Sequence, residues 1–223
     1  MDRLCCRVFL LFCLMSVAYV PAFGVNWTQP KPDELKMTSD PAAPDSPAVY
    51  LFREEIVDDK LHSHVTYARI KILTEKGKEE FSEIEIPYEK DESGVSISNV
   101  EGRTIEPDGT IVPFAGKPFN KEIVKSGDVT VMAKVFSLPD IRVGSIIEYR
   151  YLLTYEGNYF MPPTWILQRS IFVHRAHYHF VPTDSSRTIT ITDSQGHQNV
   201  VSHLVYFPLL PPWGQGSFRV GWF

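Results

Sequence analysis

The chain has 223 residues, of which 43% are hydrophobic and 22% charged, and its formal net charge is −5 at pH 7. This length is ample for one or two domains, each with its own hydrophobic core. The acidic balance and the lack of clustered Lys and Arg remove the electrostatic basis for binding nucleic acid, so we expect no nucleic-acid partner.

Residues 1–24 have the three parts of a secretory signal peptide. Arg3 and Arg7 give a positive start, and an apolar stretch of thirteen residues follows at 8–20. This stretch is shorter than the roughly 20 residues that a membrane-spanning helix needs. Ala22 and Gly24 provide the small residues that a signal peptidase recognises just before its cleavage site. We predict cleavage after Gly24, a secreted or periplasmic location, and no membrane span in the mature chain.

All the cysteines lie inside this predicted signal peptide: Cys5, Cys6 and Cys13. The mature chain, residues 25–223, therefore has no thiol and forms no disulfide. An exported chain without cysteine is typical of a bacterial envelope protein that depends on a hydrophobic core for its stability.

Residues 25–47 are predicted to form a flexible, exposed leader. Five prolines separate small and acidic residues here: Pro30, Pro32, Pro41, Pro44 and Pro47. A stretch of this composition is typical of a linker and not of a packed element. We therefore expect the folded domain to cover residues 48–206.

From residue 48 on, hydrophobic side chains recur with a period of two, which predicts β-strands. The first predicted strands cover residues 49–57, 64–74, 81–88, 95–105 and 111–114. Residues 75–78 are expected to form a hairpin loop, and residues 106–110 a turn containing Pro107 and Gly109. Within 81–88, Ile84, Ile86 and Tyr88 share one face.

The clearest predicted strand is 145–155. One face carries Ile147, Tyr149, Tyr151, Leu153 and Tyr155. Glu148 and Arg150 point to the other face. Residues 165–181 are predicted to form one bent or bulged strand, and residues 187–192 and 199–206 a final hairpin. About ten strands without an amphipathic helix predict an all-β fold, an antiparallel β-sandwich.

The tail, residues 207–223, is rich in proline and glycine and shows no alternation. Two interpretations stay open. It is either a strap packed over the sheet, or the end of a chain truncated or shifted out of frame partway through a larger protein. In the second case the domain would fold poorly without its natural neighbour.

Several catalytic classes lack their motifs in this sequence. Thiol chemistry is excluded for a mature chain without cysteine. No GxSxG or SxxK serine motif occurs, and no phosphate-binding loop or dinucleotide fingerprint. We therefore expect no catalytic residues, no cofactor and no enzymatic activity from this chain by itself.

Two His-x-His pairs are the candidate metal ligands: His62, His64, His177 and His179. On a strand, each pair places two imidazoles on one face, about 6–7 Å apart. A carboxylate would have to complete such a site, with Glu55, Asp58 or Asp59 as candidates. Arg175 beside the second pair would repel a cation. A solvated sheet face is therefore the favoured interpretation, and a stand-alone metal-binding envelope protein the alternative.

Aromatic residues around the loop 156–158 are candidates for binding a partner: Tyr155, Tyr159, Phe160 and Trp165. An exposed aromatic loop would offer large contact area to a protein or a glycan. Burial in the core of the sandwich is the favoured interpretation of the same residues.

Four strings in this order resemble a known family: 69–77 (RIKILTEKG), 86–88 (IPY), 103–110 (RTIEPDGT) and 138–151 (LPDIRVGSIIEYRY). Together they resemble the bacterial domain of unknown function 3857, over about residues 48–182. The resemblance implies a β-sandwich that follows a signal peptide and precedes a transglutaminase-like domain. The catalytic cysteine, histidine and aspartate would reside in that second domain. No residue of this chain matches that catalytic motif.

The resemblance thus implies an exported, non-catalytic accessory or binding module. Its expected partners are a transglutaminase-like domain or an envelope protein or glycan.

Overall fold

The computed structural model describes residues 27–91, 94–127, 129–156, 164–166, 170–182, 189–192, 198–201 and 217–221. The predicted signal peptide and its cysteines lie outside these residues, as does most of the proline- and glycine-rich tail. Among the described residues, no helix has both the length and the apolar character that crossing a membrane requires.

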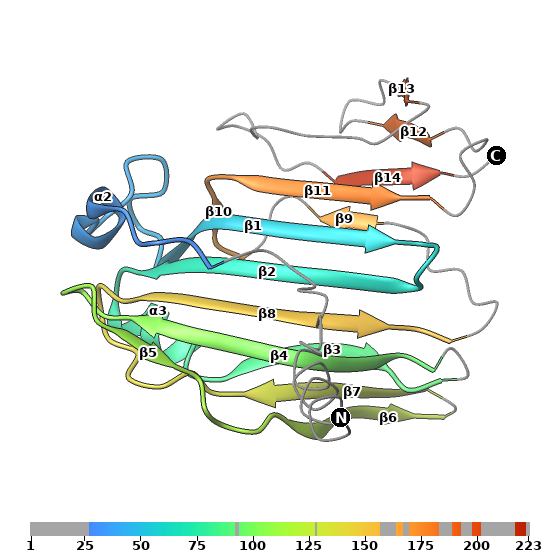
Figure 1. The fold of residues 1–223 in the computed structure, drawn as a ribbon, viewed down its shortest axis with the longest axis horizontal. Helices are drawn as coiled ribbons and strands as arrows, with labels where there is room; N and C mark the ends of the chain where they lie inside the picture. The colour runs from blue at the N-terminus through green and yellow to red at the C-terminus, as the bar shows by residue number, and fades with distance from the viewer. Residues whose placement is uncertain are drawn as a thin grey trace, which may run out of the picture.

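A sheet of seven strands forms the larger layer (Figure 1). Its strands are β1 (Ala48–Asp58), β2 (Ser63–Ile72), β4 (Ser96–Ile105), β5 (Ile111–Pro113), β8 (Ile146–Thr154), β10 (Phe172–Val173) and β11 (Ala176–Val181). The strands run in the order β10-β1-β2-β8-β4-β5, and β11 continues beside β1. Most pairs are antiparallel, as predicted, but β10 and β11 pair with β1 in parallel.

A sheet of three strands forms the second layer. It contains β3 (Ile84–Glu89), β6 (Phe119–Ser126) and β7 (Val129–Phe136), in the order β3-β7-β6. Alternation in the sequence predicted β3, whereas no strand was predicted for β6 and β7. The two sheets pack face to face, which confirms the all-β sandwich.

A further sheet of four short strands lies toward the end of the chain, in the order β13-β12-β14-β9. Its strands are β9 (Thr164–Ile166), β12 (Ile189–Thr192), β13 (Gln198–Val201) and β14 (Ser217–Gly221). The predicted final hairpin is confirmed by the antiparallel pairing of β12 with β13. The single strand predicted for 165–181 is wrong, because β9 pairs with β14 while β10 and β11 pair with β1.

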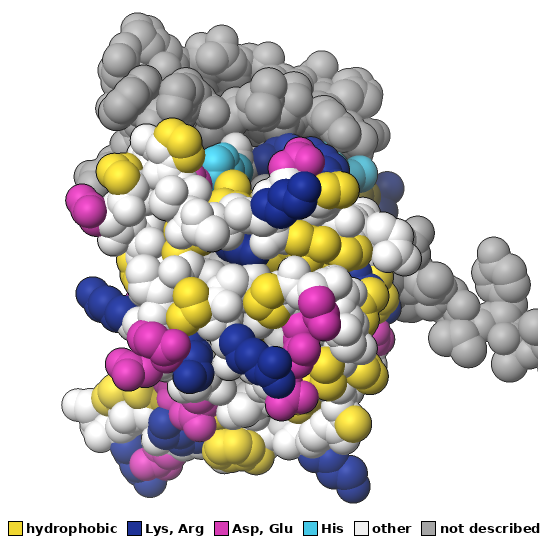
Figure 2. Space-filling model, turned by 90° about the vertical axis from the view of Figure 1, so that its left-hand side faces the viewer, with side chains coloured by type: hydrophobic (Ala, Val, Ile, Leu, Met, Phe, Trp, Pro, Cys, Tyr) yellow, Lys and Arg dark blue, Asp and Glu magenta, His cyan; other side chains and the backbone are white. Residues whose placement is uncertain are grey.

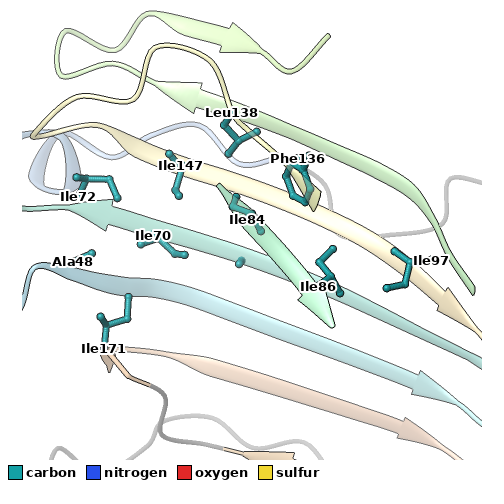
Figure 3. Packing of buried hydrophobic residues seen from close by; sticks show 11 residues of the cluster. Ala48, Ile70, Ile72, Ile84, Ile86, Ile97, Phe136, Leu138, Ile147 and Ile171 are labelled. Atoms are coloured by element: carbon teal, nitrogen blue, oxygen red, sulfur yellow. The ribbon is translucent and has the colours of Figure 1, made fainter. Parts of the chain in front are cut away.

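The main hydrophobic core lies between the two layers (Figure 3). From the smaller sheet, Ile84, Ile86 and Phe136 point onto the larger one. There they meet Ile70 of β2 and Ile147 of β8. The face of the larger sheet that carries this core is called the inner face below. The predicted inward faces of 81–88 and 145–155 are therefore confirmed for these isoleucines.

Residues 75–78 do not form the predicted hairpin loop, because a short helix, α3 (Glu75–Glu80), occupies this position. The Thr74 hydroxyl accepts a hydrogen bond from the Gly77 N–H at 3.2 Å, which caps the first turn. Gly77 lies against the backbone of Pro47, where a Cβ atom would be only 2.1 Å from the carbonyl oxygen. The helix is thus held by its cap and by a contact that only glycine permits.

The predicted flexible leader is also wrong for residues 27–47, called the N-terminal segment below. It contains helix α2 (Pro32–Lys36) and packs on the outer face of the larger sheet. Its side chains Leu35, Met37 and Ala43 contact a second hydrophobic cluster formed by Val49, Leu51, Leu73, Ile105 and Ile146. The prolines restrict the backbone without preventing this packing.

A buried charged network fastens the N-terminal segment to the sheet. Its centre is Glu148 of β8, which has no exposed surface. The Tyr67 hydroxyl and the guanidinium groups of Arg69 and Arg103 donate hydrogen bonds to its carboxylate. Arg69 also pairs with Glu34 of the segment at 2.6 Å. Burial and the adjacent Glu148 raise the pKa of Tyr67, so its hydroxyl remains a donor at neutral pH.

Trp27 adds an aromatic contact to this network. Its ring lies 5.1 Å from the Arg103 guanidinium and 4.8 Å from that of Arg150, which are cation–π distances. Its centroid is 5.9 Å from that of Tyr67. Arg69, Arg103 and Glu148 all belong to the strings that carry the family resemblance, so those strings contain the residues that join the segment to the sheet.

Lys71, which has no exposed surface, makes stability depend on pH. Its Nζ donates to the carbonyl oxygens of Leu35 (2.9 Å) and Gly144 (2.5 Å), and burial lowers its pKa to about 8. Between that value and the unfolded pKa of about 10.4, the unfolded chain binds more protons than the folded one. The free energy of unfolding should therefore rise from about pH 8 to pH 10.

Above about pH 10 the free energy of unfolding should fall again. Burial raises the pKa of Tyr67, Tyr155 and Tyr178 in the folded chain, so these tyrosines lose their protons first in the unfolded chain. Urea unfolding at several pH values would test both parts. Lys71→Met should remove the rise while keeping the fall. An unchanged rise in this variant would refute the assignment to Lys71.

Candidate binding site

A cavity of about 180 Å³ lies between the two sheets. Three strands of the larger sheet supply most of its polar lining: Tyr50, Arg53 and Glu55 from β1, Thr66 from β2, and Tyr149 and Tyr151 from β8. Glu85, Ile86 and Pro87 of β3 line it from the smaller sheet. Three aromatic rings, one arginine and two carboxylates thus meet at one place in the sandwich.

An irregularity in β1 brings the charged pair to the inner face. The register with β2 shifts between Tyr50, which lies opposite Ile70, and Phe52, which lies opposite Arg69. Beyond this bulge, Arg53 and Glu55 share the inner face with their partners Ala68 and Thr66. A regular strand would have kept Tyr50 and Arg53 on opposite faces.

Arg53 and Glu55 are 3% and 4% exposed and form an ion pair with each other. His64 Nε2 lies 3.3 Å from Glu55 Oε2. Because charges removed from water need such partners, the pairing is what allows both groups to remain in the sandwich. The cavity therefore offers an ion-paired cation and anion, together with a second carboxylate, Glu85, that pairs with Lys121 at 2.6 Å.

The tyrosines give the cavity both apolar surface and hydroxyl groups. Burial raises the pKa of Tyr149 well above its ordinary value, and the neighbouring Tyr50 and Tyr151 raise it further. Its phenol is therefore neutral at physiological pH and can donate or accept a hydrogen bond. Aromatic faces with a polar handle are common where proteins bind partners.

The size of the cavity limits what it can hold. Pockets for drug-sized ligands measure roughly 300–1,000 Å³, and this cavity is smaller, at about 180 Å³. It can accommodate one compact group, such as a single side chain or sugar unit of a larger partner. Donors and acceptors on its wall would orient that group.

The two histidine pairs proposed as metal ligands do not come together. His64 lies opposite Val57 on the inner face, whereas His177 and His179 lie opposite Glu54 and Ile56 on the outer face. His177 Nδ1 contacts the Glu54 carboxylate. His62 is in the turn before β2, with φ of 48°, and stacks on Tyr155 at 5.1 Å.

The proposed carboxylate ligands have other contacts. Glu55 pairs with Arg53, Asp58 caps the backbone N–H groups of Lys60 and Leu61, and Asp59 accepts from Tyr155. In the described part of the chain, no group of three His, Cys, Asp or Glu side chains is arranged to hold a metal ion.

Of the four aromatic candidates, Tyr155 is buried, and its hydroxyl donates to Asp59 at 3.1 Å. It is part of the interior and not of an exposed loop. Tyr159 and Phe160 lie outside the described residues. For Trp165 only the backbone is described, in β9.

Sequence reasoning missed Tyr50, Arg53 and Thr66 as site residues. It placed Tyr149 and Tyr151 on one face but did not see that they border a cavity. The available signal was the run of three charged residues at 53–55 in the middle of a predicted strand whose other residues are apolar or aromatic.

Comparison with solved structures finds a similar fold in a candidate protease from Parabacteroides distasonis ATCC 8503. The TM-score is 0.57 at 12% sequence identity, and the match covers 78% of this chain and 40% of that protein. At this identity the likeness shows the fold alone. The chain thus spans less than half the length of that protein. Among curated proteins, none matches this sequence.

Residues 58–202 match the family model of DUF3857. This family is described as a domain of unknown function with solved structure. The matched region includes β2, β3 and β8, and with them Thr66, Tyr149 and Tyr151 of the cavity. It also contains the four strings on which the resemblance rests. Because the match covers more than half of the chain, this protein belongs to the DUF3857 family.

Proposed function

We propose that this chain is an exported, non-catalytic accessory module that binds a partner by receiving one of its side chains in the cavity between the sheets. The observation that carries this proposal is the cavity itself, in which Tyr50, Tyr149 and Tyr151 surround the Arg53–Glu55 pair. Tyrosine and arginine are among the residues most enriched at binding hot spots.

The state of the ionisable groups favours binding over acid–base chemistry. Glu55 is paired with Arg53 and contacted by His64, and the raised pKa keeps Tyr149 neutral. A general acid or base works best with a pKa near the operating pH, and the strongly raised pKa of Tyr149 takes its phenol out of that role. The cavity instead offers fixed donors, acceptors and aromatic surface.

The proposed partner is a transglutaminase-like domain. Support comes from the resemblance to modules that precede such domains, and from the fold similarity to a candidate protease that is much longer than this chain. Figure 2 shows Lys and Arg side chains interspersed with Asp and Glu on one face of the molecule, without a basic patch of the kind that nucleic acid would need.

Calorimetric titration of the mature chain with a transglutaminase-like domain from a full-length family member would test this proposal. Tyr151→Ala should weaken binding by about 30-fold or more, because truncating a hot-spot residue costs about 2 kcal/mol or more. Tyr88→Ala is the matched control, since Tyr88 packs on the core but does not line the cavity. Equal affinity for wild type and Tyr151→Ala, or no binding at all, would refute the proposal.

The non-catalytic part of the proposal has its own test. The mature chain alone should neither cleave a casein substrate nor couple an amine to it, whereas the transglutaminase-like domain serves as the positive control. Turnover by the chain alone would show that it carries an active site.

A further inference from the structure

Strand β6 is an edge strand on which large hydrophobic side chains are exposed beside charged ones. It lies at the end of the order β3-β7-β6, and all eight of its residues are exposed. Phe119 (53% exposed), Ile123 (42%) and Val124 (48%) lie on it, and Val129 (51%) follows on β7. These are four of the seven large hydrophobic side chains that are exposed in the described part of the chain. Such an edge presents N–H and C=O groups to a further strand.

A bulge in β6 determines which side chains share a face. Glu122 lies opposite Met132, and Val124 lies opposite the adjacent residue Val131, so Ile123 is an extra residue. Lys125 lies opposite Thr130. Met132 and Thr130 are two residues apart on β7, so their side chains point to the same face of the sheet. Their partners Glu122 and Lys125 therefore project from that face as well.

We propose that β6 pairs in antiparallel fashion with β6 of a second copy of this chain, about a two-fold axis between Ile123 and Val124. In this register Glu122 of each copy lies opposite Lys125 of the other. Ile123 lies opposite Val124, so two opposite-charge pairs flank an apolar centre. A two-fold axis perpendicular to the sheet keeps each side chain on its own face of the extended sheet. Residues 122 and 125 would point to opposite faces of a regular strand, so only the bulge allows Glu122 and Lys125 to pair.

The self-complementary charges are the reason for choosing a second copy as the occupant. The register that places Ile123 opposite itself would bring Lys121 against Lys125, which carry like charges and project from opposite faces. The proposed pairing extends the smaller sheet to six strands across the dimer. No residue of β6 lines the cavity, although Lys121 of β6 pairs with the lining residue Glu85 at 2.6 Å.

Sedimentation equilibrium of the mature chain over micromolar to sub-millimolar concentrations tests this inference. Wild type should show a reversible monomer–dimer equilibrium. Glu122→Lys alone and Lys125→Glu alone should each weaken dimerisation by about tenfold or more, since each places like charges opposite each other twice. The double variant should dimerise like wild type, and a mixture of the two single variants should form a heterodimer.

Lys117→Glu is the control, because Lys117 is exposed but lies before β6. Circular dichroism would establish that every variant keeps its fold, which is expected for substitutions at exposed positions. A wild-type chain that remains monomeric at all concentrations would overturn the inference. So would a dimer that the single charge reversals leave intact, or one that neither the double variant nor the mixture restores.

Discussion

Replacing Glu148 with Gln is expected to lower the free energy of unfolding by about 3–5 kcal/mol, the typical cost of removing one partner from a buried ion pair. The Glu148 carboxylate is completely buried and accepts hydrogen bonds from Tyr67, Arg69 and Arg103. Gln keeps the volume but not the charge, so Arg103 loses its carboxylate partner and Arg69 keeps only Glu34. Urea denaturation at pH 7 measures the change.

Glu101→Gln is the matched control for this substitution. Glu101 pairs with Arg150 at 2.7 Å, but its side chain is 51% exposed. An exposed pair contributes about 0–1 kcal/mol, so the control should lose far less stability than Glu148→Gln. Similar losses in the two variants would mean that the network around Glu148 does not hold the N-terminal segment as described.

Gly77→Ala is expected to destabilise the fold by about 2–3 kcal/mol, within the range for overpacking. The new Cβ would lie 2.1 Å from the carbonyl oxygen of Pro47. That oxygen already accepts the N–H groups of Leu73 (3.0 Å) and Thr74 (3.1 Å), so it cannot move away without loss of these bonds.

Helix propensity acts in the opposite direction, because Ala is favoured over Gly in a helix by about 1 kcal/mol. The steric clash should outweigh this gain. Thermal unfolding compares Gly77→Ala with Lys76→Ala, an exposed position of the same helix that should change stability little. A Gly77→Ala variant more stable than wild type would show that propensity prevails and that the contact with Pro47 is loose.

The alternation of hydrophobic residues predicted the inner faces correctly where one face of a strand meets the core. Ile84 and Ile86 of β3 are buried against Ile147 of β8, as their spacing indicates. The same rule failed on the outer face. Every residue from Thr66 to Ile72 is buried, including the charged Arg69 and Lys71. Their partners come from the N-terminal segment and from Gly144 and Glu148, all far away in the sequence, and alternation carries no information about such contacts.

Local irregularities account for what else the sequence did not reveal. The bulge after Tyr50 reverses the faces of β1, so the cavity was invisible to a rule that assumes regular strands. Strand β6 mixes Lys, Glu and apolar residues because both of its faces are exposed. By contrast, Val129, Val131, Ala133 and Val135 of β7 do alternate, so that strand could have been predicted.

The most direct test of partner binding through the cavity is a set of amide ¹H–¹⁵N spectra of the mature chain, recorded with and without the transglutaminase-like domain. Changes in peak position should concentrate at the strands that line the cavity, around Tyr50, Thr66 and Tyr151. Changes confined to β6 or to the N-terminal segment, or no changes at all, would contradict binding through the cavity.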